Sequence, residues 1–223
     1  MRESPKIVVI LSGCGVNDGA EIHEATLALL ALAQRGAQVT IAAPDIPQRR
    51  VFDHAAGREV PDQSRNVLAE AGRIARGAIR NLAELDPAEF DGVFLPGGYG
   101  AALNLSDLAL AGAGIRVDPT TASFLSRAHA AGKALGAVCI APPILAKVLA
   151  DAGVRDARLT IGNDPGTADV IRALGQVHVD CAADACVVDK ANRVVTGPAY
   201  MLAGDIAELH RGIDAAVTAL LAL

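Results

Sequence analysis

Apolar runs alternate with polar, glycine-containing segments along this chain in the pattern of an α/β protein. The runs 6–11, 37–43 and 92–95 are short and almost wholly apolar, which indicates strands buried on both faces of a parallel sheet. Between the first two, residues 21–35 carry apolar side chains on one helical side, and Gly36 follows in the usual position of a helix-ending glycine. These elements predict a βαβ unit.

The same alternation continues through the rest of the chain. Residues 44–66 are polar and irregular, and we expect an excursion there with a hairpin around 51–52 and 59–60. A short helix and a strand near 78–82 are expected next, and Asp86-Pro87 is a good helix start. Further helices are predicted at 106–110, 119–131, 142–150, 164–174 and 205–221, and further strands at 133–138, 159–161, 176–179, 185–188 and 193–196. This order predicts a doubly wound, mostly parallel α/β sheet.

Composition and charge narrow the class of protein. The 223 residues fit a single domain over 1–223, and 52% hydrophobic but only 3% aromatic residues predict a core of small aliphatic side chains. A net charge of −5 without a dense run of Lys or Arg disfavours nucleic-acid binding. No secretory signal and no apolar stretch of about 18 residues are found, so we expect no membrane association.

The four cysteines, at 14, 139, 181 and 186, form no CxxC pair. With no secretory signal, they indicate reduced thiols and a cytoplasmic protein, and no metal site is predicted.

Cys139 is the candidate nucleophile. An apolar strand precedes it and a helix that opens with Pro142 follows it, so Cys139 is expected on a sharp strand-to-helix turn. Ala137 and Ala141 supply the small side chains that such a crowded turn needs. A helix N-terminus beside the sulfur favours the thiolate. The alternative interpretation is a buried structural cysteine.

Three special segments follow predicted strands: 12–15, 96–100 and 139–141. Ligands bind at the carboxyl ends of the strands in such sheets, so we expect these segments to converge. Glycine at 97 and 98 lets backbone N–H groups face a ligand, and the N–H groups of Gly98 and Ile140 are a candidate oxyanion hole. An ordinary strand-to-helix turn is the alternative explanation of the glycine pair.

Acidic residues near the start of the first helix are candidates for the partner of Cys139. Glu21 and Glu24 share a helix face, and a carboxyl group beside the sulfur would have a raised pKa and would move a proton. Glu24 is favoured and Glu21 is kept as the alternative; compensation of the helix dipole explains either one without catalysis. Cys14, near the end of the first strand, is an auxiliary candidate at the edge of the pocket, and packing is favoured over catalysis for this second thiol.

These residues resemble the PfpI superfamily, which is related to class I glutamine amidotransferase domains and includes the parkinsonism-associated deglycase. The resemblance is carried by Glu24, by Leu95-Pro96-Gly97-Gly98 with Asn104-Leu105-Ser106, and by Cys139-Ile140-Ala141-Pro142. Residues 11–16, 159–162 and 199–203 are similar to the ElbB group of glyoxalases, which was once linked to isoprenoid biosynthesis. The likeness covers about residues 5–221.

The resemblance implies a flavodoxin-like core, a cysteine nucleophile with a glutamate partner, no cofactor and a homodimer. Many members of the superfamily place a histidine directly after the nucleophile or about twenty residues later, but this chain has Ile140 and no histidine at 161–164. A Cys-His-Asp triad for amide hydrolysis is therefore disfavoured. We expect a cofactor-independent glyoxalase that acts on small 2-oxoaldehydes through a Cys139 hemithioacetal. The alternatives are a redox-sensing or protective thiol protein and a PfpI-type cysteine hydrolase.

Overall fold

A seven-stranded sheet forms the centre of the computed structural model, which describes residues 4–223. Its strands stand in the order β10-β11-β7-β6-β1-β2-β5, and all neighbours are parallel except the antiparallel pair β10 and β11. The strands are β1 (Lys6–Ile10), β2 (Gln38–Ala43), β5 (Arg80–Asn81), β6 (Gly92–Leu95), β7 (Ala134–Val138), β10 (Val187–Asp189) and β11 (Val194–Gly197).

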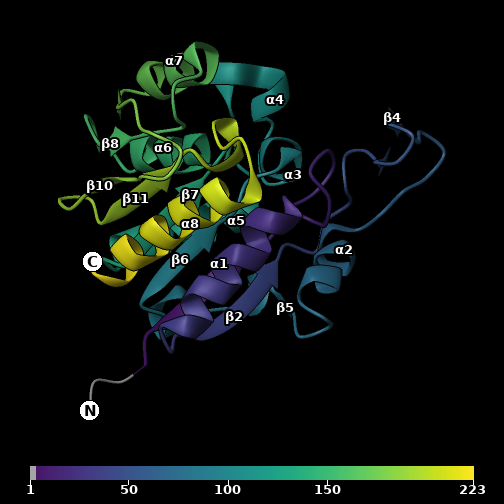
Figure 1. Cartoon of the computed structure of the whole chain (residues 1–223), viewed down its shortest axis with the longest axis horizontal. Coiled ribbons are helices and arrows are strands. Elements are labelled where there is room, and N and C mark those ends of the chain that lie inside the picture. The colour runs from purple at the N-terminus through teal and green to yellow at the C-terminus, as the bar shows by residue number, and fades with distance from the viewer. Residues whose placement is uncertain (1–3) are drawn as a thin grey trace.

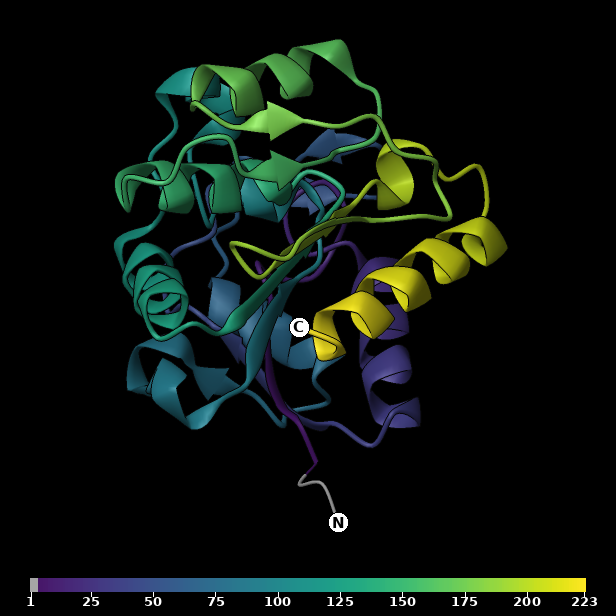
Figure 2. The same cartoon turned by 90° about the vertical axis from the view of Figure 1, so that its left-hand side faces the viewer.

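Helices cover both faces of this sheet (Figures 1 and 2). Helices α1 (Ile22–Gln34), α2 (Val67–Ile74) and α8 (Ile206–Leu221) bury their apolar sides against one face. Helices α5 (Pro119–Ala130) and α6 (Pro142–Asp151) do so against the other. Because β1, β6 and β7 are enclosed on both faces, their sequences are apolar at nearly every position, as fully buried parallel strands require. The predicted flavodoxin-like fold is confirmed.

Smaller elements surround the carboxyl ends of the central strands. They include the hairpin β3 (Phe52–Asp53) and β4 (Arg58–Glu59), and the short helices α3 (Tyr99–Leu103) and α4 (Leu108–Ala111). Helix α7 (Pro165–Ala173) packs on β9 (Val177–His178), which pairs with β8 (Arg158–Leu159). Four 3-10 turns lie at Leu82–Glu84, Pro87–Glu89, Gly112–Gly114 and Ala199–Met201. Within residues 4–223, no helix has the length and hydropathy that a membrane-crossing helix needs.

Most predicted elements are found within two or three residues of their expected limits, and the hairpin of the 44–66 excursion is present. Three details differ from the prediction. The helix expected at Asp86 is only the 3-10 turn Pro87–Glu89, because Gly92 already begins a buried strand. Helix α3 was not predicted, and the helix expected from Ser106 begins at Leu108, because Ser106 pairs with Val117 in an isolated bridge.

Candidate active site

Cys139 lies on a strained turn between β7 and α6. Its backbone has a φ of +61°, in the left-handed region that side chains other than glycine rarely adopt. The Cys139 N–H donates to the carbonyl of Gly197 at 2.9 Å, which ties the turn to the end of the neighbouring strand β11. This conformation projects the side chain from the carboxyl edge of the sheet, as a nucleophile elbow requires.

The Glu24 carboxyl group lies against Cys139 and is completely buried. It hydrogen-bonds to the Cys139 side chain, accepts from the Gly97 N–H at 2.7 Å through Oε2, and accepts from the Tyr200 N–H at 3.2 Å through Oε1. Residues from three other parts of the chain therefore hold the Glu24 carboxyl group in place. Of the two glutamates that the sequence left open, Glu24 is the one in contact with the sulfur.

The two side chains shift each other's protonation. Burial raises the pKa of Glu24 to about 7, the neighbouring Glu21 also raises it, and the hydrogen bonds with Cys139, Gly97 and Tyr200 oppose the rise. Burial, followed by the negative charge of Glu24, raises the pKa of the Cys139 thiol well above its ordinary value. The N–H groups of Gly98 and Ile140 hydrogen-bond to the sulfur and act in the opposite direction.

The direction of the Cys139 shift is opposite to the sequence expectation of a thiolate favoured by the helix dipole. That expectation considered the start of α6 alone, whereas burial and an adjacent carboxylate dominate at this site. Burial disfavours one negative charge at this site, and repulsion between the two groups disfavours a second. The Glu24–Cys139 pair therefore retains a proton near neutral pH. Glu24, with a pKa of about 7, is the group of the pair that is able to exchange this proton.

The glycines at 97 and 98 are required by close contacts at the site. A Cβ atom on Gly97 would lie 2.4 Å from the Cys139 Cβ, 2.8 Å from its Sγ and 2.9 Å from Glu24 Oε2. Gly98 has a φ of +91°, and a Cβ there would lie 2.4 Å from the Glu21 nitrogen. Only glycine therefore lets this turn pass between the elbow and the start of α1.

The other two candidates occupy different positions. Glu21 is the N-cap of α1: its Oε2 accepts from the Glu24 N–H at 2.7 Å, and its side chain also lines the cavity beside Cys139. Cys14 does not line this cavity, so the expectation that it flanks the pocket was wrong. The turn that holds Cys14 folds back onto Gly19, and burial followed by the charge of Glu70, on α2, raises the pKa of its thiol.

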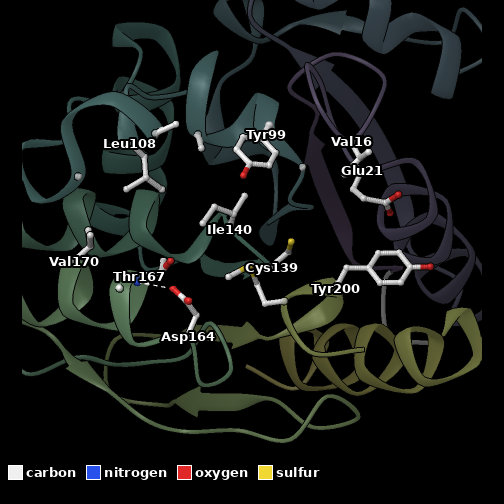
Figure 3. A pocket seen from close by; sticks show the side chains of 16 residues that line it. Val16, Glu21, Tyr99, Leu108, Cys139, Ile140, Asp164, Thr167, Val170 and Tyr200 are labelled. Carbon is white, nitrogen blue, oxygen red and sulfur yellow. Dashed lines mark hydrogen bonds between the residues drawn. The ribbon is translucent and has the colours of Figure 1, made fainter. Parts of the chain in front are cut away.

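A cavity of about 560 Å³ opens over the sulfur (Figure 3). Figure 3 shows Cys139 and Ile140 between Glu21 and Tyr200 on one side and Thr167 and Val170 on the other. The cavity is lined by Val16, Glu21, Gly98, Tyr99, Ala102, Leu108, Ala109, Gly112, Cys139, Ile140, Asp164, Gly166, Thr167, Val170, Tyr200 and Met201.

Several of these residues were not identified from the sequence as parts of a site. Tyr200 binds Glu24 through its backbone, and its hydroxyl lies 2.8 Å from Nδ1 of His23. Asp164, Thr167 and Val170 come from α7 and its N-cap. The first helical turn of α7 has no glycine-rich motif after a central strand, so no sequence signal connected it with the elbow.

The part of the chain that the structure describes contains no group of three His, Cys, Asp or Glu side chains arranged to hold a metal ion. His178 is buried, and its Nε2 accepts from the Ile161 N–H at 3.3 Å. Among residues 4–223, none of those that line the cavity is a histidine. The arrangement therefore offers a thiol, a carboxyl group and two backbone N–H donors at one point.

A family model that is described as the DJ-1/PfpI family matches residues 6–203, a range that includes the cysteine elbow, the buried glutamate and the Gly97-Gly98 turn. The chain belongs to the DJ-1/PfpI family. The resemblance recognised in the sequence is thereby confirmed.

Two mammalian proteins match the whole chain. It is 43% identical to the human "Glutamine amidotransferase-like class 1 domain-containing protein 3, mitochondrial" and 42% identical to the rat "ES1 protein homolog, mitochondrial", and it spans 84% and 85% of their lengths. An ES1 protein of zebrafish, also named mitochondrial, is 31% identical over 87% of this chain and 76% of its own. The mitochondrial names overturn the cytoplasmic prediction, because lack of a secretory signal does not separate the cytoplasm from an organelle.

Solved structures agree with this assignment. An isoprenoid biosynthesis protein with an amidotransferase-like domain from Ehrlichia chaffeensis has a TM-score of 0.88 and 34% identity, over 97% of this chain and 99% of its own. Glyoxalase III of Candida albicans has a TM-score of 0.59 over 98% of this chain and 95% of its own. At 16% identity, the second likeness shows the fold alone.

Proposed function

We propose that this DJ-1/PfpI protein is a cofactor-independent glyoxalase that converts glyoxal, and also methylglyoxal, to the 2-hydroxy acid. The observation that carries the proposal is the buried Glu24 carboxyl group, which hydrogen-bonds to the Cys139 thiol while two backbone N–H groups face the same sulfur. A glyoxalase needs a nucleophile for the aldehyde, donors for the oxyanion and one group that moves a proton between two carbons.

In the first step, the Glu24 carboxylate takes the Sγ proton as the sulfur bonds to the aldehyde carbon. The carbonyl oxygen becomes an oxyanion that accepts hydrogen bonds from the N–H groups of Gly98 and Ile140. Glu24 then returns the proton to this oxygen, which gives a neutral hemithioacetal. A carboxyl group with a pKa of about 7 is suited to both directions of transfer.

In the second step, Glu24 removes the hydrogen of the carbon that is bonded to the Cys139 sulfur, as a proton, and delivers it to the neighbouring carbon. The hydroxyl proton on the sulfur-bearing carbon passes to the oxygen on the neighbouring carbon. The enediol intermediate of this step thereby becomes a 2-hydroxy thioester. Water then adds to the thioester, and the Cys139 sulfur leaves and regains a proton through Glu24. The products are glycolate from glyoxal and lactate from methylglyoxal, and no step needs an external oxidant or reductant.

The two alternatives from the sequence receive less support. An oxidation-sensing cysteine needs an accessible thiolate, whereas burial and Glu24 raise the pKa of Cys139. A cysteine amidase needs an acid for the amine leaving group, which histidine usually supplies, and the described residues place no histidine at the cavity.

The test is glyoxal consumption and glycolate formation by the purified protein and by Cys139→Ala. We expect the wild type to form one glycolate for each glyoxal lost, and the variant to form it no faster than buffer does. Equal rates for the two proteins would remove the mechanism.

A further inference from the structure

The cavity over Cys139 is much larger than glyoxal needs, and its volume of about 560 Å³ is within the range of roughly 300–1,000 Å³ that accommodates drug-sized ligands. Glyoxal has only two carbon atoms and would contact a small part of the wall near the sulfur. The remaining volume extends toward α4 and α7. A substrate that uses this wall must carry a substituent on its carbonyl group.

The wall distant from Glu24 is largely apolar. Leu108 and Ala109 from α4, Ala102 from α3 and Val170 from α7 all line it. Apolar walls contribute binding energy in proportion to the apolar area that a ligand covers, at about 25 cal/mol per Å². The substituent that suits this wall is therefore a hydrocarbon or aromatic group.

The charges around the cavity have one sign. Glu21 lines the side near the sulfur and Asp164 lines the rim at the N-terminus of α7. The N–H and hydroxyl of Thr167 hold the pKa of Asp164 below its usual range, so this carboxyl group is ionised at neutral pH. Among residues 4–223, no lysine, arginine or histidine lines the cavity.

One cation stands close to this lining without joining it. The Arg50 guanidinium lies 5.4 Å from the centre of the Tyr99 ring, which itself lines the cavity. Its Nε donates to the Asn17 carbonyl at 2.8 Å, and its Nη1 forms an ion pair with Glu59 at 2.8 Å. Arg50 is thus paired with Glu59 of the hairpin β3–β4, and its charge does not neutralise the carboxyl groups that line the cavity.

From this size and charge, resting on the glyoxalase activity proposed above, we infer the substrate class: a 2-oxoaldehyde with a bulky apolar substituent, free of anionic groups and favoured when it carries a positive charge toward Asp164. Carboxylated and phosphorylated aldehydes are disfavoured, because no cationic side chain of the described lining compensates their charge, whereas Glu21 and Asp164 oppose it.

The charge preference is tested without turnover, by the rates at which methanethiosulfonates of matched size modify Cys139. Each reagent forms a mixed disulfide with the sulfur and releases methanesulfinate. The probes are the cationic trimethylammonioethyl and the anionic sulfonatoethyl reagents, with labelling at Cys139 measured by peptide mass spectrometry. We expect a cation-to-anion rate ratio several-fold above that of glutathione, and a several-fold fall of this ratio in Asp164→Asn.

Asp169→Asn is the matched control, because Asp169 lies on the same helix, pairs with Arg172 and does not line the cavity. Its rate ratio should equal that of the wild type. A wild-type ratio equal to that of glutathione, or an equal fall in both variants, would overturn the charge assignment.

The size preference is tested with glyoxal and phenylglyoxal, by comparing kcat/KM. The wild type should prefer phenylglyoxal, and Val170→Phe should lower the ratio of kcat/KM for phenylglyoxal to kcat/KM for glyoxal at least ten-fold. Val177→Phe is the control, since Val177 is exposed on β9, away from the cavity. Equal use of both aldehydes by the wild type would refute the size assignment and leave the proposed function intact. Turnover of neither aldehyde would refute the proposed function, while the disulfide rates would still decide the charge assignment.

Discussion

Glu24 and Cys139 are buried together, and the carboxyl group of one hydrogen-bonds to the thiol of the other. Burial raises the pKa of both groups, and the charge of Glu24 raises the pKa of Cys139 further, whereas the interaction with Cys139 lowers the pKa of Glu24. A pair of this kind keeps one proton over a wide pH range and passes it between its members. This relationship supports the proposal that Glu24 is the acid and base of the site, and it has consequences that are measurable outside catalysis.

The first consequence is a pH dependence of stability. The pKa of Glu24 is about 7 in the folded protein, whereas an unfolded glutamate has a pKa of about 4.3. Between these values the folded state binds the proton more tightly, so the free energy of unfolding falls as pH rises through the window and is level above it. The total change is roughly 4 kcal/mol.

Urea unfolding of the wild type and of Glu24→Gln, at a series of pH values from about 4 to about 8, measures this change. The difference between the two free energies of unfolding isolates Glu24 from other titrating groups. Glu84→Gln, at an exposed position, is expected to follow the wild type. Parallel curves for the wild type and Glu24→Gln would contradict the raised pKa.

The second consequence concerns the thiol. Because the carboxylate of Glu24 raises the pKa of Cys139, Glu24→Gln should move the inflection of Cys139 alkylation by iodoacetamide to lower pH. The wild-type inflection should lie above that of a free cysteine. Alkylation is followed at the Cys139 peptide by mass spectrometry.

Glu21→Gln is the informative control for this shift. Glu21 caps α1 through one carboxylate oxygen, and a glutamine side chain also carries an acceptor oxygen for the Glu24 N–H. We expect no change of the Cys139 inflection in this variant. If the Cys139 inflection shifts in Glu21→Gln and not in Glu24→Gln, then Glu21, and not Glu24, is the acidic partner of Cys139.

A third prediction concerns the turn that separates the pair. In Gly97→Ala the new methyl group would collide with Cys139 and with Glu24 Oε2, and the contact with the Cys139 Cβ is not relieved by a flexible chain end. We expect a loss of about 1–3 kcal/mol in stability, as for other overpacked sites, and loss of the reaction. Thermal unfolding and glycolate formation report the two effects.

Gly72→Ala is the comparison, because the nearest atom to its added methyl group is a side-chain carbon of Ile79 at an ordinary 3.6 Å. Gly72 lies within α2, where alanine is the better helix former, so unchanged or slightly higher stability is expected. Equal tolerance of alanine at 97 and 72 would show that the elbow and Glu24 are not packed as described.

The sequence was sufficient for the central sheet and for the elements that meet at the elbow. Buried parallel strands leave continuous apolar runs, and glycine or proline follows them where the chain must turn, as at Leu95-Pro96-Gly97. The contact between Glu24 and Cys139 was predictable because both residues stand at the same edge of such a sheet. Their roles in catalysis stay predictions.

Other features needed the three-dimensional structure. Residues 99–103 form α3 directly after Gly98, which has no side chain to cap the helix, so the sequence carries no N-cap signal there. Asp164 and Val170 line the cavity because α7 packs on β9, on α6 and on the turn Gly112–Gly114, an arrangement that the pattern of apolar residues does not specify. The direction of the Cys139 pKa shift depends on burial, and a local argument from the helix dipole gave the opposite sign.

The most direct test of the account is the pH profile of kcat/KM for conversion of glyoxal to glycolate by the wild type and by Glu24→Gln. Glu24 accepts a proton only when ionised, so the wild-type value should rise with pH through an inflection near 7. Glu24→Gln should be slower by roughly 10²–10⁴-fold and should lack this inflection. A wild-type profile that is flat between about pH 6 and 8, or a Glu24→Gln variant as fast as the wild type, would contradict the claim that Glu24 moves the proton at Cys139.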